Sequence, residues 1–151
     1  MTKALSRFYI FISFFTYITA GFCQVQQEVP PAYNITTASF MQNGTNMYPF
    51  FRLGEPLVFA FDDLFGNEAN YYYTIQHCNY DWTPSSMLSV NDYIDGFDNQ
   101  RIQTYANSFN TLQLYSRYTL SFPNKFTRLT LSGNYILKIL NDDREVVFTR
   151  R

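Results

Sequence analysis

The chain is poor in the residue types that most often carry chemistry. Its 151 residues include one histidine and two cysteines, whereas a zinc site needs three or four nitrogen or sulfur ligands. Charged residues make up only 15% of the chain, and its eleven Lys and Arg residues form no run. A nucleic-acid-binding protein needs a clustered basic surface. The composition therefore predicts that the chain binds neither a metal nor nucleic acid.

Residues 1–23 have the features of a secretory signal peptide. Lys3 and Arg7 supply the positive charges, and residues 8–20 form an apolar run interrupted only by Ser and Thr. Such a run is short for a membrane span, which needs roughly 20 apolar residues. Small residues at −3 and −1 predict cleavage before Gln24. We therefore expect the protein to be exported.

The two cysteines are separated by this expected cleavage. A lipoprotein interpretation of Cys23 is the alternative, but Phe22 stands where a lipobox has a small residue. Cleavage removes Cys23 and leaves Cys78 alone, so no intrachain disulfide can form. The domain must then be stabilised by its hydrophobic core, and Cys78 is expected to pack as a small buried side chain.

Aromatic residues make up 20% of the chain, and most of them are Tyr and Phe, which favour strands. Short strands recur about every ten residues between turn signals, and this pattern predicts an antiparallel β-sandwich, immunoglobulin-like in general shape. The expected domains are a signal peptide at 1–23, a linker at 24–32 and the β-sandwich at 33–151. The predicted strands are 33–40, 57–61, 71–78, 102–109, 111–122, 129–131, 135–140 and 145–151, with a short helical turn from Ser89 and a turn at Asn43-Gly44.

The strand 111–122 shows the clearest alternation. Its predicted buried face carries Leu112, Leu114, Tyr118, Leu120 and Phe122, because successive side chains of a strand point to opposite faces. The chain stops directly after its last strand, and we expect it to be the N-terminal fragment of a longer protein. The edge beside residues 145–151 should then be open to pairing.

Residues 71–82 contain the only Trp, the only His and one of the two Cys, which suggests a catalytic site. Adjacent strand residues face opposite sides, so His77 and Cys78 cannot form a nucleophile–base pair. We predict instead that His77 hydrogen-bonds locally, to the turn at Asp81, and that Trp82 fills the core with its indole N–H paired. The chain is therefore predicted not to be an enzyme.

The acidic residues do not predict a metal-binding or catalytic site either. The five candidate Ca²⁺ ligands lack the spacing of an EF-hand loop; they are Asp62, Asp63, Asp92, Asp95 and Asp98. A carboxylate pair for glycoside hydrolysis need only meet in space, and nothing selects two of the twelve acidic residues. No cofactor is predicted. A carbohydrate-binding or hydrolytic β-sandwich remains the alternative function.

Six short motifs resemble those of one protein family, and they occur in the same order as in that family. They are His77-Cys78-Asn79-Tyr80-Asp81-Trp82 with Ser85, Tyr93-Ile94-Asp95-Gly96-Phe97, Ser108-Phe109-Asn110-Thr111, Tyr115-Ser116-Arg117-Tyr118, Phe122-Pro123-Asn124 and Leu131-Ser132-Gly133-Asn134-Tyr135. Together they resemble the type IX secretion system plug protein family of Bacteroidota. The resemblance covers about residues 33–151, and family members are longer, so it concerns their N-terminal domain.

The resemblance implies a periplasmic, mostly β protein without known catalytic residues. It implies binding to the outer-membrane translocon barrel, whose pore the plug blocks when no substrate passes. The motif residues themselves are expected to specify the fold. Gly96 and Gly133 would supply unusual backbone angles, and Asn110, Asn124 and Asn134 would cap turns. The aromatic residues expected to pack are Phe97, Phe109, Tyr118 and Tyr135.

Overall fold

The computed structural model describes residues 27–42, 45–46 and 48–151. The expected signal peptide and the Asn43-Gly44 turn lie outside the described residues. Within these ranges, no helix is long and apolar enough to cross a membrane.

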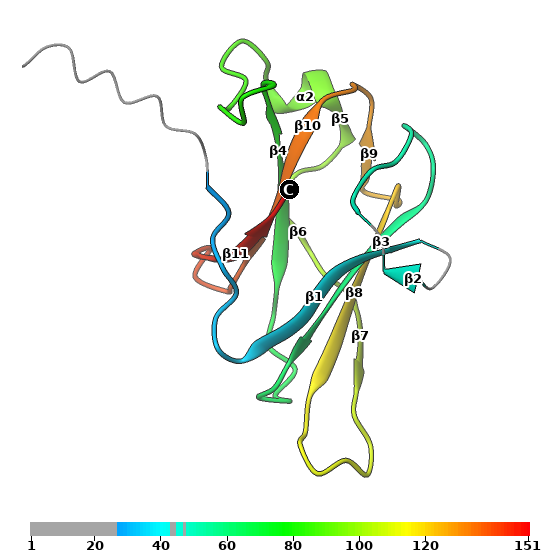
Figure 1. Ribbon diagram of the computed structural model, residues 1–151, viewed down its shortest axis with the longest axis vertical. Helices are drawn as coiled ribbons and strands as arrows, with labels where there is room; N and C mark the ends of the chain where they lie inside the picture. The colour runs from blue at the N-terminus through cyan, green and yellow to red at the C-terminus, as the bar shows by residue number, and fades with distance from the viewer. Residues whose placement is uncertain (1–26, 43–44, 47) are drawn as a thin grey trace, which may run out of the picture.

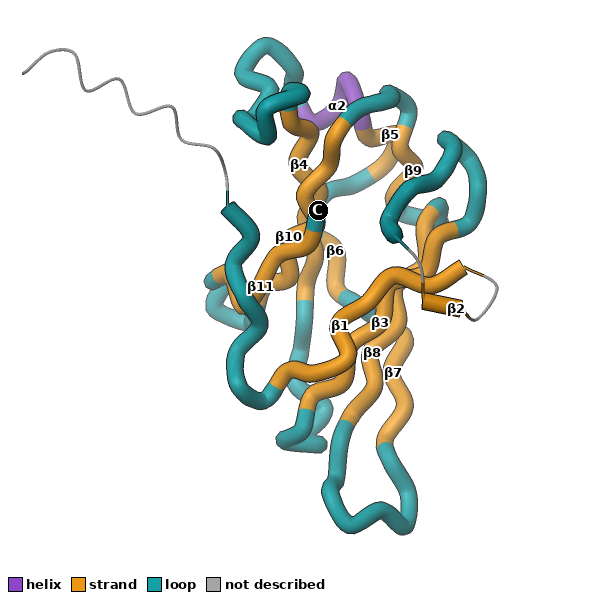
Figure 2. Tube along the Cα trace, viewed as in Figure 1, coloured by secondary structure: helices purple, strands orange, loops and turns teal. Residues whose placement is uncertain are grey.

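Antiparallel strands make up almost all of the regular secondary structure of the described chain, and the all-β prediction is confirmed (Figures 1 and 2). One sheet has the order β2-β1-β3-β8-β7, a second has β11-β10-β4-β6, and a small third sheet pairs β5 with β9. The strands are β1 (Ile35–Gln42), β2 (Thr45–Asn46), β3 (Leu57–Asp63), β4 (Tyr72–Cys78), β5 (Ile94–Gly96), β6 (Gln100–Arg101), β7 (Thr104–Asn107), β8 (Ser116–Phe122), β9 (Thr127–Leu129), β10 (Asn134–Leu140) and β11 (Val146–Arg150), with one short helix, α2 (Val90–Tyr93).

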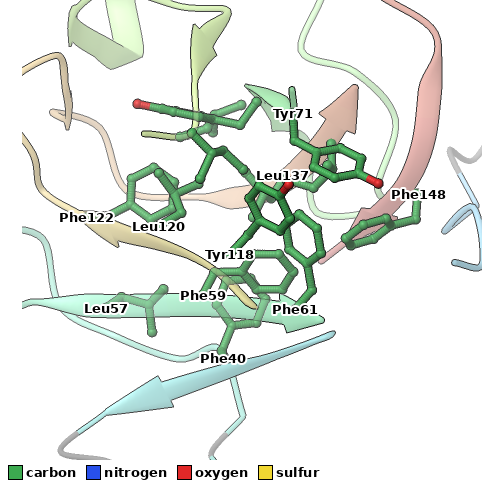
Figure 3. Packing of buried hydrophobic residues seen from close by; sticks show 14 of the residues in the cluster. Phe40, Leu57, Phe59, Phe61, Tyr71, Tyr118, Leu120, Phe122, Leu137 and Phe148 are labelled. Atoms are coloured by element: carbon green, nitrogen blue, oxygen red, sulfur yellow. The ribbon is translucent and has the colours of Figure 1, made fainter. Parts of the chain in front are cut away.

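The core lies between the five-stranded and four-stranded sheets, as in a sandwich (Figure 3). The Phe61 ring of β3 stacks on Tyr118 of β8 at 5.1 Å and meets Phe148 of β11 edge-on at 5.3 Å between ring centroids. Phe59 and Phe148 are fully buried. Burying an aromatic side chain of this kind stabilises a fold by about 1.5–3 kcal/mol. The packing of aromatic side chains between the two sheets therefore holds the sheets together without a disulfide among the described residues.

The predicted strand 111–122 is too long. β8 begins at Ser116, and Leu112 and Leu114 are exposed rather than buried. The ladder with β7 ends at the pair Asn107↔Ser116, and Asn110 adopts a left-handed φ of 56°, which turns the chain away from the sheet. Tyr118, Leu120 and Phe122 are buried as predicted.

The N-terminal segment covers part of the sheet edge that was expected to be open. The Thr149 amide of β11 donates to the Val29 carbonyl at 3.0 Å, and the Val29 amide donates to the Thr149 hydroxyl at 2.8 Å. Pro30 and Pro31 follow, and proline has no amide hydrogen to continue a ladder. The prediction of an open edge is thus wrong at residue 149, because residues 28–29 lie beside it and Val29 forms hydrogen bonds with Thr149.

Buried tyrosines should make the fold sensitive to alkali. Burial raises the pKa of Tyr118 to about 12, well above its ordinary 10.0, and the Tyr118 hydroxyl donates to the Ala69 carbonyl. The unfolded state therefore loses its proton first, so the stabilisation is present below about pH 10 and is lost as pH rises toward about 12. Urea unfolding at several pH values should show this fall. Tyr118→Phe should show a shallower one, and an equal slope would contradict the assignment.

Candidate functional site

His77 and Cys78, the pair that suggested catalysis, do not face one another in the structure. Cys78 is 1% exposed, and burial raises the pKa of its thiol, so it is a packed side chain as predicted. His77 lies on the opposite side of β4 and is only partly buried. Among the described residues, no group of three or more His, Cys, Asp or Glu side chains could hold a metal ion.

His77 is a structural anchor, with a partner other than the predicted one. Its Nδ1 lies 2.7 Å from the Ser85 hydroxyl, and its ring meets Tyr135 edge-on at 5.0 Å. Asp81 instead accepts hydrogen bonds from the Thr83 amide and hydroxyl, which hold the pKa of its carboxyl below the ordinary value. His77 therefore fixes the 79–85 loop directly, without Asp81.

The first and last family motifs meet in space. An added Cβ on Gly133 would lie 2.2 Å from His77 Nε2, so only glycine lets the two segments approach this closely. The Asn134 side chain donates to the Asn79 carbonyl at 3.0 Å, and β10 pairs with β4 at Asn134↔Cys78. The Asn134 side chain thus binds the neighbouring loop across the sheet.

Beside this junction lies a pocket of about 700 Å³ between the two main sheets. Motif residues Trp82, Ser132, Gly133, Asn134 and Tyr135 form part of its wall. Trp82 is only half-buried, and the Arg151 guanidinium lies over its ring at 4.5 Å. The prediction that Trp82 fills the core is therefore wrong, because Trp82 lines the pocket and does not belong to the core cluster.

A second junction joins the motifs around Gly96 and Pro123. The Phe97 amide donates to the Phe126 carbonyl at 2.6 Å, and the Asn124 side chain accepts from the Phe126 and Thr127 amides. Asn124 is thus a turn cap, as predicted, directly after the cis Phe122-Pro123 peptide. Phe97 is 66% exposed, so its predicted packing is wrong.

The third motif region is the tip of the β7–β8 hairpin, which forms one end of the molecule (Figure 1). We define the tip as residues 108–115, which contain no charged side chain. Phe109 is 93% exposed and Leu112 is fully exposed, so the predicted packing of Phe109 is also wrong. Tyr118 packs as predicted at the base of the hairpin, and Tyr135 is partly buried.

Polar side chains of the tip satisfy its own backbone. The Ser108 amide donates to the Tyr115 carbonyl at 2.8 Å, and the Tyr115 amide donates to the Ser108 hydroxyl at 2.9 Å. Gln113 donates to the Leu64 carbonyl at 3.0 Å and so ties the tip to the β3–β4 connection. The tip is therefore held in shape while its apolar side chains face solvent. Sequence reasoning missed this surface, because its alternating pattern also fits a strand.

Comparisons with known proteins give a consistent result. Residues 35–151 match the family model described as the type 9 secretion system plug protein 1st domain. The chain is similar to the crystal structure of a hypothetical protein from Parabacteroides merdae, with 32% identity and a TM-score of 0.72. That similarity covers 81% of this chain and 32% of the other, so this chain spans about a third of that protein. No curated protein matches.

Proposed function

We propose a function from one premise: this chain belongs to the type 9 secretion system plug protein family, as its first domain. We infer that it is a non-enzymatic component of that secretion system, exported to the periplasm, which binds the outer-membrane translocon and helps to plug its pore. The match over residues 35–151 is the observation that carries this proposal.

The tip of the β7–β8 hairpin is the surface that we assign to translocon binding. Exposed apolar side chains that cluster at one place mark sites of protein interaction, and Phe109, Leu112 and Leu114 cluster here. The hydrogen bonds within the tip hold these side chains in place before binding, which lowers the entropy cost of association. Blocking a pore requires a rigid body with such a surface and no chemistry.

Capture from the cell envelope tests this assignment. A tagged chain should recover an outer-membrane barrel of the secretion system, identified by mass spectrometry. The double variant F109S/L112S should lower this recovery by about tenfold or more, because truncating buried anchor residues weakens an interface by 1–2 kcal/mol each.

Met87→Ser is the matched control, since Met87 is 96% exposed and lies outside the tip. It should leave recovery unchanged. Equal losses in both variants would contradict the role of the tip. Recovery of no translocon by a folded, unaltered chain would contradict the proposed function itself.

A further inference from the structure

Strand β7 forms one end of the five-stranded sheet, and among the described residues it pairs only with β8 (Figure 2). All of its four residues are exposed. A strand at the end of a sheet presents unpaired backbone amide and carbonyl groups, which can pair with a further strand. The free edge of β7 is therefore a surface for strand addition.

The register of the β7–β8 hairpin shows which backbone groups lie on this edge. The Ser108 amide donates to the Tyr115 carbonyl at 2.8 Å, so the backbone of Ser108 faces β8. Residues of an antiparallel strand alternate between facing one neighbour and facing away from it. The backbone groups of Ala106 therefore face β8, and those of Tyr105 and Asn107 face away from the sheet.

The edge of β7 lacks the features that usually prevent strands from pairing. Such features are charged side chains, proline and a covering segment. Residues 102–116 contain no charged residue and no proline. The edge of β11, by contrast, carries Arg150, and Val29 forms hydrogen bonds with Thr149 there, directly before Pro30. The edge of β7 is thus uncharged and, within the described chain, not covered by another strand.

Contacts on one face of β7 hold the strand in its extended shape. The Tyr105 ring packs against Tyr118 at 5.7 Å between ring centroids, and the Tyr105 hydroxyl donates to Glu68 at 3.0 Å. The Asn107 side chain also donates to Glu68. A strand that is already ordered loses less conformational entropy when it binds, which favours pairing at this edge.

We propose that β7 pairs antiparallel with β7 of a second copy of this chain, about a two-fold axis at Ala106. Antiparallel pairing is reciprocal, so one edge can complement itself in a symmetric dimer. Tyr105 of each copy would stand opposite Asn107 of the other, and each such pair would exchange both of its backbone hydrogen bonds.

A second copy suits this edge in size and in charge. At the axis Ala106 meets its own counterpart, and its small side chain fits a spacing of about 4.5 Å between the two Cα atoms. No two charged side chains from residues 102–116 would oppose one another, because this stretch is uncharged. The two five-stranded sheets would then form one continuous sheet.

Sedimentation equilibrium of the unaltered chain measures this association. The paired edge is short, so we expect a weak dimer with a dissociation constant between about 1 µM and 1 mM. A chain that remains monomeric up to about 1 mM would overturn the proposal. Self-association requires no translocon, so this result is independent of the function proposed from the family match.

Charge variants at the axis locate the interface. A106K and A106E each place two like charges directly opposite one another, and each should raise the dissociation constant about tenfold or more. An equal mixture of the two variants should recover dimers, because opposite charges then meet. Met87→Lys adds a charge at a side chain that is 96% exposed and lies outside β7, and it should dimerise like the unaltered chain.

Three results would overturn pairing through β7. The first is a dimer that A106K leaves unchanged. The second is a failure of the mixed A106K and A106E variants to dimerise while thermal melts show that both are folded. The third is loss of the dimer in F109S/L112S but not in A106K, which would place the interface at the apolar tip instead.

Discussion

Gly96→Ala is expected to lower the free energy of unfolding by about 3–4 kcal/mol, among the larger effects that a single substitution produces. Gly96 has a φ of 119°, and an added Cβ would lie 2.0 Å from the Phe126 carbonyl oxygen and 2.8 Å from its carbon. The obstacle is backbone, so no side-chain rotation relieves it. The Phe97 amide donates to the same oxygen, and separating the two segments would break this bond and the pairing of β5 with β9.

Gly54→Ala is the matched control for this substitution. Gly54 has a φ of 86°, yet an added Cβ would have no atom within 4 Å. Its cost should be the backbone strain alone, about 1 kcal/mol. Urea or guanidinium unfolding of both variants gives the comparison. If Gly96→Ala costs no more than Gly54→Ala, the close approach to Phe126 does not constrain this junction.

The strands with alternating aromatic and β-branched residues were predictable from the sequence. β3, β4 and β10 lie within two residues of their predicted bounds, because each is rich in the aromatic and aliphatic side chains that suit a pleated, largely buried surface. In β4 burial follows the alternation of the strand, since Tyr71, Tyr73 and Ile75 are buried and the residues between them are only partly buried. A strand of this kind can therefore be predicted from its sequence, because its composition reflects its place in the core.

Exposed apolar residues are where prediction failed. Phe97, Phe109, Leu112 and Leu114 were expected to pack, and all four face solvent. A hydrophobic residue in a sequence pattern indicates a contact, but the pattern does not say whether the partner lies in the same chain. At the tip, Leu112 and Leu114 are exposed because β8 pairs with β7 only from Ser116 onward. Where this pairing begins depends on the tertiary structure, so the local sequence pattern does not predict it.

The contact between the first and last motifs could not be predicted from the local sequence either. The segments around His77 and Gly133 lie more than fifty residues apart in sequence, and their contact depends on the register of β4 against β10. The sequence pattern places these residues in family motifs and predicts structural roles for them. It did not show that Trp82 and residues 132–135 border one pocket, because neither segment has a distinctive ligand-binding pattern.

Asp63→Ala should also be strongly destabilising, by about 3–5 kcal/mol, because it removes one partner from a buried polar network. Asp63 is fully buried at the end of β3. Its Oδ1 accepts from the Asn34 side chain at 2.8 Å and from the Phe65 amide at 3.1 Å, and its Oδ2 accepts from the Tyr71 hydroxyl at 2.9 Å. Alanine would leave these donors unpaired around a small cavity.

Asp95→Ala provides the contrast, since Asp95 forms an ion pair with Arg128 in which both side chains are more than half exposed. Exposed pairs contribute about 0–1 kcal/mol, so this variant should melt close to the unchanged chain. Asp63→Asn should lie between the two, because the amide keeps one acceptor oxygen for the same donors. Equal stability of Asp63→Ala and Asp95→Ala would show that the buried network around Asp63 contributes little to the free energy of unfolding.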